Sequence, residues 1–180
     1  MKTSLQNGSF WKYFYANSTN GDGHCLIYSM IDSMKDQCNI DFNYSNICNR
    51  IRTETHDYIS YYKDLLLIES NLEIQRLLCA YVDGKNFDTR FGDLIPLILS
   101  NVLCVSIIII SKNGGSYDYF VTYPRINCHG FVFIHKVGDH YEGLKMVVHI
   151  GSPIGIQHTT KTTPHGSTSG TGSVSLWPFF

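Results

Sequence analysis

A run of β-branched residues at 104–111, CVSIIIIS, is the feature that most constrains the fold of this chain. A short, continuous apolar run of this composition predicts a strand that is buried on both faces. Before it, apolar residues recur at close to the helical period, and after it the pattern is that of strands. Helices followed by strands predict an α+β domain.

Four helices are expected before this strand. The first begins at Cys25, directly after a Gly-Asp-Gly turn. The second covers 45–66 and has Ser45 as its N-cap. The third begins after Ser70, which has capping-box spacing to a glutamate, and the fourth begins after Asp93 as its N-cap.

Three more strands are expected after the β-branched run. The NGG at 113–115 predicts a hairpin turn into the strand SYDYFVTY. The segments GFVFIHK and LKMVVHI are the next two strands, and the loop VGDHYEG at 137–143 separates them. The last part of the predicted domain therefore consists of strands.

The distribution of composition predicts one domain and a tail. A chain of 180 residues is long enough for one sizeable core. The first twenty residues show no clear periodicity, and Gly, Ser, Thr and Pro dominate after residue 150. We expect one domain at 1–150, with its core at about 18–150, and a Gly/Ser/Thr-rich tail at 151–180.

Charge and cysteine usage exclude several classes of function. The formal net charge of −1 gives no bulk attraction to nucleic acid or to an anionic membrane. No apolar run approaches the ~20 residues of a membrane span, and the N-terminal residues lack the apolar region of a secretory signal. Six cysteines without a closely spaced pair predict free thiols in the cytoplasm and argue against a zinc site. We expect a monomer without metal, cofactor, nucleic-acid or membrane partner.

The stretch NGDGHCLIYSM at 20–30 places Cys25 where a helix begins. A helix N-terminus offers unpaired amides and a positive dipole end, which favour both a thiolate and an oxyanion. The glycines allow a tight turn, and Asp22 can hold it by accepting hydrogen bonds from backbone amides. Taken alone, the stretch leaves two alternatives open: Cys25 is a nucleophile, or it is the first buried residue of a helix.

A histidine downstream favours the first alternative. A cysteine nucleophile needs an imidazole as base and acid, and His140 lies in GDHYEGL at the mouth of a strand. Glu142, two residues on, points to the same side of an extended chain and can hold the useful tautomer of the ring. A histidine at a strand end is by itself usually a surface residue. A catalytic role for His140 is therefore supported only by its combination with Cys25.

These motifs resemble those of the ovarian tumour (OTU) family of cysteine deubiquitinases, some of which are viral or belong to mobile elements. NGDGHCLIYSM is similar to the nucleophile motif, Asp-Gly-x-Cys before an apolar helix, and GDHYEGL is similar to the His-Tyr motif. TRFGDLIPLILSNVLCVSIIII resembles the segment between them. The resemblance covers about 18–150 and implies a papain-like OTU fold, with a central β-sheet packed between helical regions.

The resemblance also implies roles for individual residues. Cys25 matches the nucleophile, and His140 matches the general base and acid. Asp22 matches the residue of the oxyanion loop, together with the backbone amides of Gly23, His24 and Cys25. His24 occupies the variable position of the motif, where a residue at the rim of the site is expected.

Glu142 departs from the family pattern, which usually has Asp or Asn at this position. Glutamate is one methylene longer, which leaves three alternatives open. The loop shifts to present the Glu142 carboxylate, another acceptor serves His140, or a cysteine–histidine dyad suffices.

The activity that the resemblance implies is hydrolysis of the isopeptide bond at the C-terminus of ubiquitin, through a thioester acyl-enzyme. The partner is then ubiquitin or polyubiquitin. The helical region at about 45–90 and the segment NGGSYDYF are expected to contact the body of ubiquitin, with Phe91, Tyr117, Tyr119 and Tyr123 as candidates for its apolar patch. The alternative for these aromatic residues is packing within the core or the sheet.

Two other functions remain open at this point. One is an inactive or catalytically weak ubiquitin-binding module with the same fold, which the unusual Glu142 favours and the Cys25/His140 pair disfavours. The other is a peptidase or a protease for another ubiquitin-like modifier, because the choice of modifier depends on surface residues that carry no motif.

Overall fold

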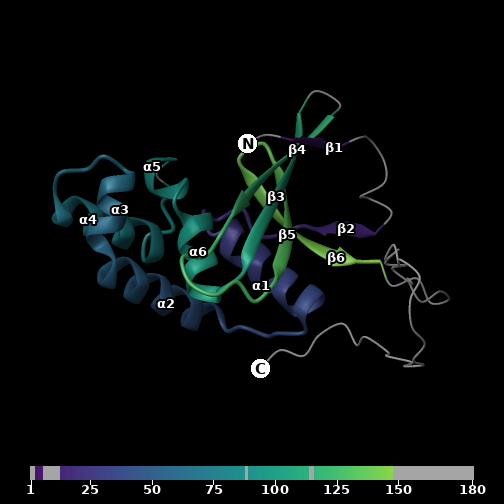
Figure 1. Cartoon of the computed structure of the whole chain (residues 1–180), viewed down its shortest axis with the longest axis horizontal. Helices are drawn as coiled ribbons and strands as arrows, with labels where there is room; N and C mark the ends of the chain where they lie inside the picture. The colour runs from purple at the N-terminus through teal and green to yellow at the C-terminus, as the bar shows by residue number, and fades with distance from the viewer. Residues whose placement is uncertain (1–2, 6–12, 88, 114–115, 148–180) are drawn as a thin grey trace, which may run out of the picture. The chain divides into compact units, whose positions relative to one another are not determined.

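A mixed β-sheet forms the centre of the fold, and the isoleucine-rich run lies in its middle. The computed structural model describes residues 3–5, 13–87, 89–113 and 116–147. Its strands are β1 (Thr3–Leu5), β2 (Phe14–Asn17), β3 (Ser106–Asn113), β4 (Ser116–Thr122), β5 (Phe131–Val137) and β6 (His140–Met146). Within these described ranges the six strands pair in the order β1-β4-β3-β5-β6-β2 (Figure 1).

Strand β3 confirms the expectation of a strand covered on both faces. It pairs antiparallel with β4 and parallel with β5. Ile109 and Ile110 point to opposite faces because they are neighbours on a strand, and both are buried. The α+β fold class is confirmed. The predicted turn at 113–115 and the predicted tail at 151–180 include residues outside the described ranges.

The strands near the ends of the domain differ from the prediction. Strands β1 and β2 were not expected, because their short segments carry no periodicity. Strand β6 begins at His140 rather than at residue 144, so the segment at 137–143 is mostly strand and not loop. The connection from β5 is a tight turn at Gly138, whose φ is +59°. Buried Tyr141 and Leu144 hold β6 to the core, although polar residues alternate with them.

The helices precede β3, as expected, but three of their predicted boundaries were wrong. They are α1 (Cys25–Cys38), α2 (Tyr44–Asp57), α3 (Ile59–Leu65), α4 (Asn71–Val82), α5 (Thr89–Gly92) and α6 (Ile95–Leu103). The expected helix at 45–66 is interrupted at Tyr58, and Asn43 rather than Ser45 is its N-cap, accepting from two backbone amides. Asp93 is not a cap, because α6 starts after Leu94. Ser70 caps α4 as predicted.

Helix α1 lies along β5 and β6, and its side chains bond to the strand backbone. Ser33 Oγ accepts from the Leu144 amide at 2.9 Å. Gln37 donates to the Phe133 and Leu144 carbonyls at 2.8 and 2.7 Å and accepts from the Phe133 amide at 2.9 Å. At Gly143 the helix is so close that a Cβ would lie 2.9 Å from the Asp32 Cβ. These contacts place α1 firmly against the sheet.

Helix α6 joins the other helices to the sheet. It packs on α2 on one side and on β3 and β4 on the other. None of the described helices has both the length and the apolar character that crossing a membrane requires.

A buried hydroxyl in α2 gives a prediction for stability. Thr55 is fully buried, and its Oγ1 has no hydrogen-bond partner among the described residues. Thr55→Val keeps the shape and helix propensity of the side chain but removes the unsatisfied hydroxyl. We expect the free energy of unfolding, measured by urea denaturation, to rise by about 1 kcal/mol.

Ser100→Ala is the matched control, because the buried Ser100 hydroxyl donates to the Val105 carbonyl at 2.7 Å. This change should lower the free energy of unfolding by about 1 kcal/mol. Equal destabilisation by the two changes would contradict the assignment of Thr55 as unsatisfied.

Candidate active site

Cys25 is the first residue of α1, as the sequence predicted, and is 7% exposed. The first hydrogen bond of the helix runs from the Tyr28 amide to the His24 carbonyl at 3.1 Å. The amides of the first turn, including that of Cys25, therefore precede the helical ladder and have no helical acceptor. The Cys25 side chain thus sits at the positive end of the helix dipole, next to amides that can bind an oxyanion.

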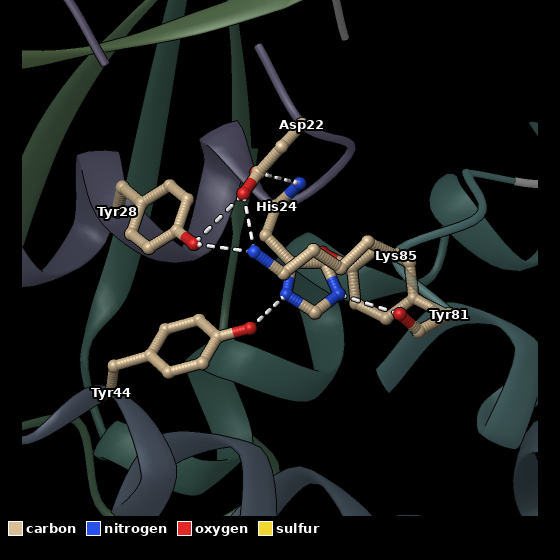
Figure 2. Close-up of polar contacts among 6 residues, drawn as sticks. All are labelled: Asp22, His24, Tyr28, Tyr44, Tyr81 and Lys85. Atoms are coloured by element: carbon tan, nitrogen blue, oxygen red, sulfur yellow. Dashed lines mark hydrogen bonds and ion pairs between the residues drawn. The ribbon is translucent and has the colours of Figure 1, made fainter. Parts of the chain in front are cut away.

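Asp22 holds the loop that leads into α1. Its Oδ1 accepts from the His24 amide at 3.2 Å, and its Oδ2 accepts from the Tyr28 hydroxyl at 3.1 Å (Figure 2). Oδ2 also forms an ion pair with Lys85 Nζ. The hydrogen bond from Lys85 is the main cause that lowers the pKa of Asp22, against a smaller opposing effect of burial. Asp22 is therefore a carboxylate that fixes the loop. The His24 amide donates its hydrogen bond to Asp22, whereas the Cys25 amide lies at the start of the helix.

Gly23 is required by the path of this loop. Its φ is +88°, and a Cβ at this position would lie 1.9 Å from the carbonyl oxygen of Lys85. Only glycine fits both constraints. Gly21, in contrast, has nothing within 4 Å of an added Cβ and does not need to be glycine for space. The tight turn that the sequence predicted therefore depends on Gly23.

Alanine at the two glycines tests this difference. Gly23→Ala should lower the free energy of unfolding by roughly 1–3 kcal/mol, because it strains the backbone and pushes against Lys85. Gly21→Ala should leave this free energy nearly unchanged. Urea denaturation of both variants measures the effect, and similar losses in the two would show that the close approach to Lys85 is not what requires glycine.

His24 is fully buried, so the expectation that it lies at the rim of the site was wrong. Its Nε2 donates to the Tyr81 carbonyl at 2.6 Å, and its Nδ1 accepts from the Tyr44 hydroxyl (Figure 2). The Tyr81 carbonyl can only accept, which assigns the proton to Nε2. Burial lowers the pKa of His24, so the ring is neutral and structural. It ties the start of α1 to α2 and α4.

This buried ring makes stability depend on pH. The pKa of His24 in the folded chain lies below its ordinary value of 6.5, so the unfolded chain binds a proton that the folded chain does not. We expect the free energy of unfolding to be highest above about pH 6.5 and to fall as the pH drops below that value. Denaturation curves at several pH values measure this decrease.

His24→Gln is the control, because glutamine does not titrate. The decrease below pH 6.5 should be smaller in this variant than in the wild type. Identical pH dependence in the two proteins, or direct NMR titration of His24 with an ordinary pKa, would contradict the prediction.

His140 is the first residue of β6 and lies at the end of the strand that is closest to Cys25. Along α1, Asp32 approaches Gly143 and Ser33 bonds to Leu144, so the start of the helix lies beside the start of β6. Burial, followed by electrostatic interactions with Asp93 and Cys25, raises the pKa of Tyr141 to about 12. The helix that begins at Cys25 and the strand that begins at His140 are therefore packed together.

Glu142 does not bond to His140, which corrects the expectation from the sequence. It lies directly opposite His135 in the β5–β6 pair, and His135 Nδ1 donates to its Oε2 at 2.9 Å. The hydrogen bond of the His140 ring is instead to Thr19, whose Oγ1 lies 3.4 Å from Nε2. Cross-strand register decided this pairing, and it cannot be derived from the i, i+2 spacing alone.

Three residues of the site were missed by the sequence analysis. Thr19 contacts His140, and Lys85 pairs with Asp22. Tyr81 carries a buried hydroxyl that has no hydrogen-bond partner in the described part of the chain. Burial, followed by an electrostatic interaction with Cys25, raises the pKa of Tyr81 well above its usual range. No local motif marks these residues, because the residue that each one contacts lies 50 or more positions away in the sequence.

The aromatic residues proposed to contact ubiquitin fall into two groups. Phe91 is fully buried and packs near Tyr81, with ring centroids 6.1 Å apart, so its assignment to the surface was wrong. Tyr123 is exposed, and Tyr117 is half-buried. Tyr119 lines a cavity of about 500 Å³ whose wall also includes Asp93, Pro96, Ile109, Lys136 and Tyr141. The cavity therefore adjoins Tyr141, the residue that follows His140 in the sequence.

The described residues contain no group of three or more His, Cys, Asp or Glu side chains arranged to hold a metal ion. All six cysteines are free thiols.

The fold is that of OTU domains of known structure. The viral OTU domain protease from Taggert virus has a TM-score of 0.58 at 16% identity, over 84% of this chain and 88% of that chain. The OTU deubiquitinase from Wolbachia pipientis wMel bound to ubiquitin has a TM-score of 0.52 at 16% identity, over 74% and 96%. The Hazara virus OTU bound to ubiquitin gives 0.54 at 16% identity, over 81% and 87%.

These similarities establish a shared fold, since the identities are low. No protein-family model and no curated protein sequence matches the chain.

Proposed function

We propose that this chain, which has the fold of OTU domains, is a cysteine-dependent deubiquitinase that cleaves the isopeptide bond after the C-terminal glycine of ubiquitin. The observation that carries the proposal is that Cys25 begins α1, that His140 begins β6, and that this helix packs along this strand. Two of the similar OTU structures contain bound ubiquitin, which supports ubiquitin as the partner of this chain.

The first half of the reaction forms a thioester. His140 takes the proton of the Cys25 thiol, and the thiolate attacks the carbonyl carbon of the terminal glycine. The oxyanion forms near the free amides of the first turn of α1, while Asp22 keeps the preceding loop in place. His140 then gives its proton to the departing lysine amine, and the carbon–nitrogen bond breaks.

The second half releases ubiquitin. His140 removes a proton from a water molecule, which attacks the thioester carbonyl. The carbon–sulfur bond breaks, and His140 returns its proton to the Cys25 sulfur. The new carboxylic acid of ubiquitin then loses its own proton to the solvent. No cofactor enters either half of this sequence.

Two features support access for an extended, narrow substrate. Gly21 has open space where a side chain would lie, so the loop before Cys25 presents bare backbone to a substrate at this position. The Gly-Gly end of ubiquitin has no side chains to obstruct such an approach. The cavity beside Tyr141, with Tyr119 in its wall, offers an apolar and charged surface next to the same end of the sheet.

Ubiquitin with an electrophilic C-terminus tests the proposal. We expect a covalent adduct, seen as a mass increase of one ubiquitin. Cys25→Ala should abolish the adduct, and His140→Ala should slow its formation about 10²- to 10⁴-fold, because the thiol then lacks its base.

Cys128→Ala is the matched control for non-specific thiol labelling. Cys128 is exposed. Partial burial acts to raise the pKa of its thiol, but hydrogen bonds with Ser106 and Gly130 together lower this pKa. This variant should form the adduct at the wild-type rate. Labelling by a probe of another modifier but not of ubiquitin would make the substrate assignment wrong. Binding of ubiquitin without any adduct would instead identify an inactive binding module, which the pairing of Glu142 with His135 favours.

A further inference from the structure

We infer that Thr19 is the positioning residue of His140, in the place that a carboxylate or an amide would otherwise take; the inference rests on the proposed role of His140 as base and acid. Thr19 lies between the end of β2 and the Asp22 loop. Its hydroxyl is the group that hydrogen-bonds to the His140 ring among the described residues. The same short segment of chain therefore carries the nucleophile loop and the group that orients the base.

The single proton of the Thr19 hydroxyl is already committed. Oγ1 donates to the Tyr141 carbonyl at 2.6 Å, and that carbonyl can only accept. Toward His140 Nε2, 3.4 Å away, Oγ1 therefore presents lone pairs and can only accept. This arrangement requires a proton on Nε2 of the neutral ring.

The consequence for chemistry is a free lone pair on Nδ1. A neutral imidazole carries one proton, so a proton on Nε2 leaves Nδ1 able to accept the proton of the Cys25 thiol. When the ring becomes charged, Nε2–H stays bonded to Thr19 and Nδ1 carries the proton taken from the thiol. Thr19 thus selects the tautomer and the ring orientation in both states, as the third member of a triad does.

Glu142 is not available for this role. Its carboxylate accepts from His135 across the β5–β6 pair at 2.9 Å, and both side chains are mostly buried. To reach His140 it would have to give up this charge-assisted hydrogen bond. The structure therefore separates two functions that the sequence had assigned to one residue: Glu142 joins two strands, and Thr19 holds the base.

A hydroxyl also differs from a carboxylate in charge. It fixes the geometry of the imidazole but adds no negative charge that would stabilise the imidazolium. The contribution of Thr19 is therefore orientation. Its loss should reduce turnover more than binding, since the contact is to the base and not to ubiquitin.

The test uses the full chain and compares three variants. Thr19→Val keeps the shape and removes the hydroxyl, Thr19→Ser keeps the hydroxyl, and Glu142→Gln removes the other candidate carboxylate. Two quantities are measured: the tautomer of His140, from long-range ¹H–¹⁵N correlations of its ring, and kcat and KM for cleavage of a fluorogenic ubiquitin substrate. The melting temperature of each variant is recorded, with Thr55→Val as the same substitution made far from the site.

We expect the wild type, Thr19→Ser and Glu142→Gln to show the Nε2–H tautomer. Thr19→Val should show a mixture of tautomers and a fall in kcat of about tenfold to a hundredfold with little change in KM. Thr19→Ser should recover most of this loss. This combination supports the inference, because a merely structural role of Thr19 would not change the tautomer.

Three results would overturn it. One is the Nδ1–H tautomer in the wild type, and a second is a Thr19→Val variant with unchanged tautomer and kcat. A change of tautomer in Glu142→Gln equal to that in Thr19→Val would return the role to Glu142. If the wild type cleaves no ubiquitin substrate, the proposed function fails, but the tautomer measurement still decides whether Thr19 orients the ring.

Discussion

The hydrogen bonds from α1 to the backbone of β5 and β6 are the interactions on which the candidate site depends. Ser33 and Gln37 lie two to three turns after Cys25, and together they bond to the backbone of both strands. A helix held at these points has little freedom to slide or rotate along the sheet. The position of the thiol relative to the start of β6 is therefore set far from the thiol itself, by contacts that have no chemical role.

The loop before Cys25 is held by two networks of different character. On the buried side, the neutral ring of His24 bonds to the backbone carbonyl of Tyr81 in α4 and to the hydroxyl of Tyr44 in α2. On the exposed side, Asp22 joins Lys85 and Tyr28 (Figure 2). An exposed ion pair contributes little free energy by itself, so the buried network and the close approach at Gly23 carry most of the stability of the loop. Asp22 then acts mainly by fixing the direction of one amide.

The sequence predicted the features that depend on local pattern. The β-branched run, the start of α1 at Cys25 and the Ser70 cap follow from periodicity and from cap chemistry, and all are confirmed. The errors concern features that arise from pairing between distant segments. Burial of His24 depends on Tyr44 and Tyr81, and the start of β6 at His140 depends on its ladder with β5. Nothing in the local sequence distinguishes a polar strand held by its neighbours from a loop.

The pairing of Glu142 shows how this limit affects a functional interpretation. Strand β6 does present His140 and Glu142 to one side, as the i, i+2 spacing predicts. Glu142 nevertheless pairs with His135, the residue opposite it on β5, whose Nδ1 binds its carboxylate at 2.9 Å. A strand residue always has a cross-strand neighbour at least as close as its i+2 neighbour. Assigning a catalytic partner on a strand therefore requires the register first, and here the register leaves the imidazole to a hydroxyl that lies 121 residues earlier in the chain.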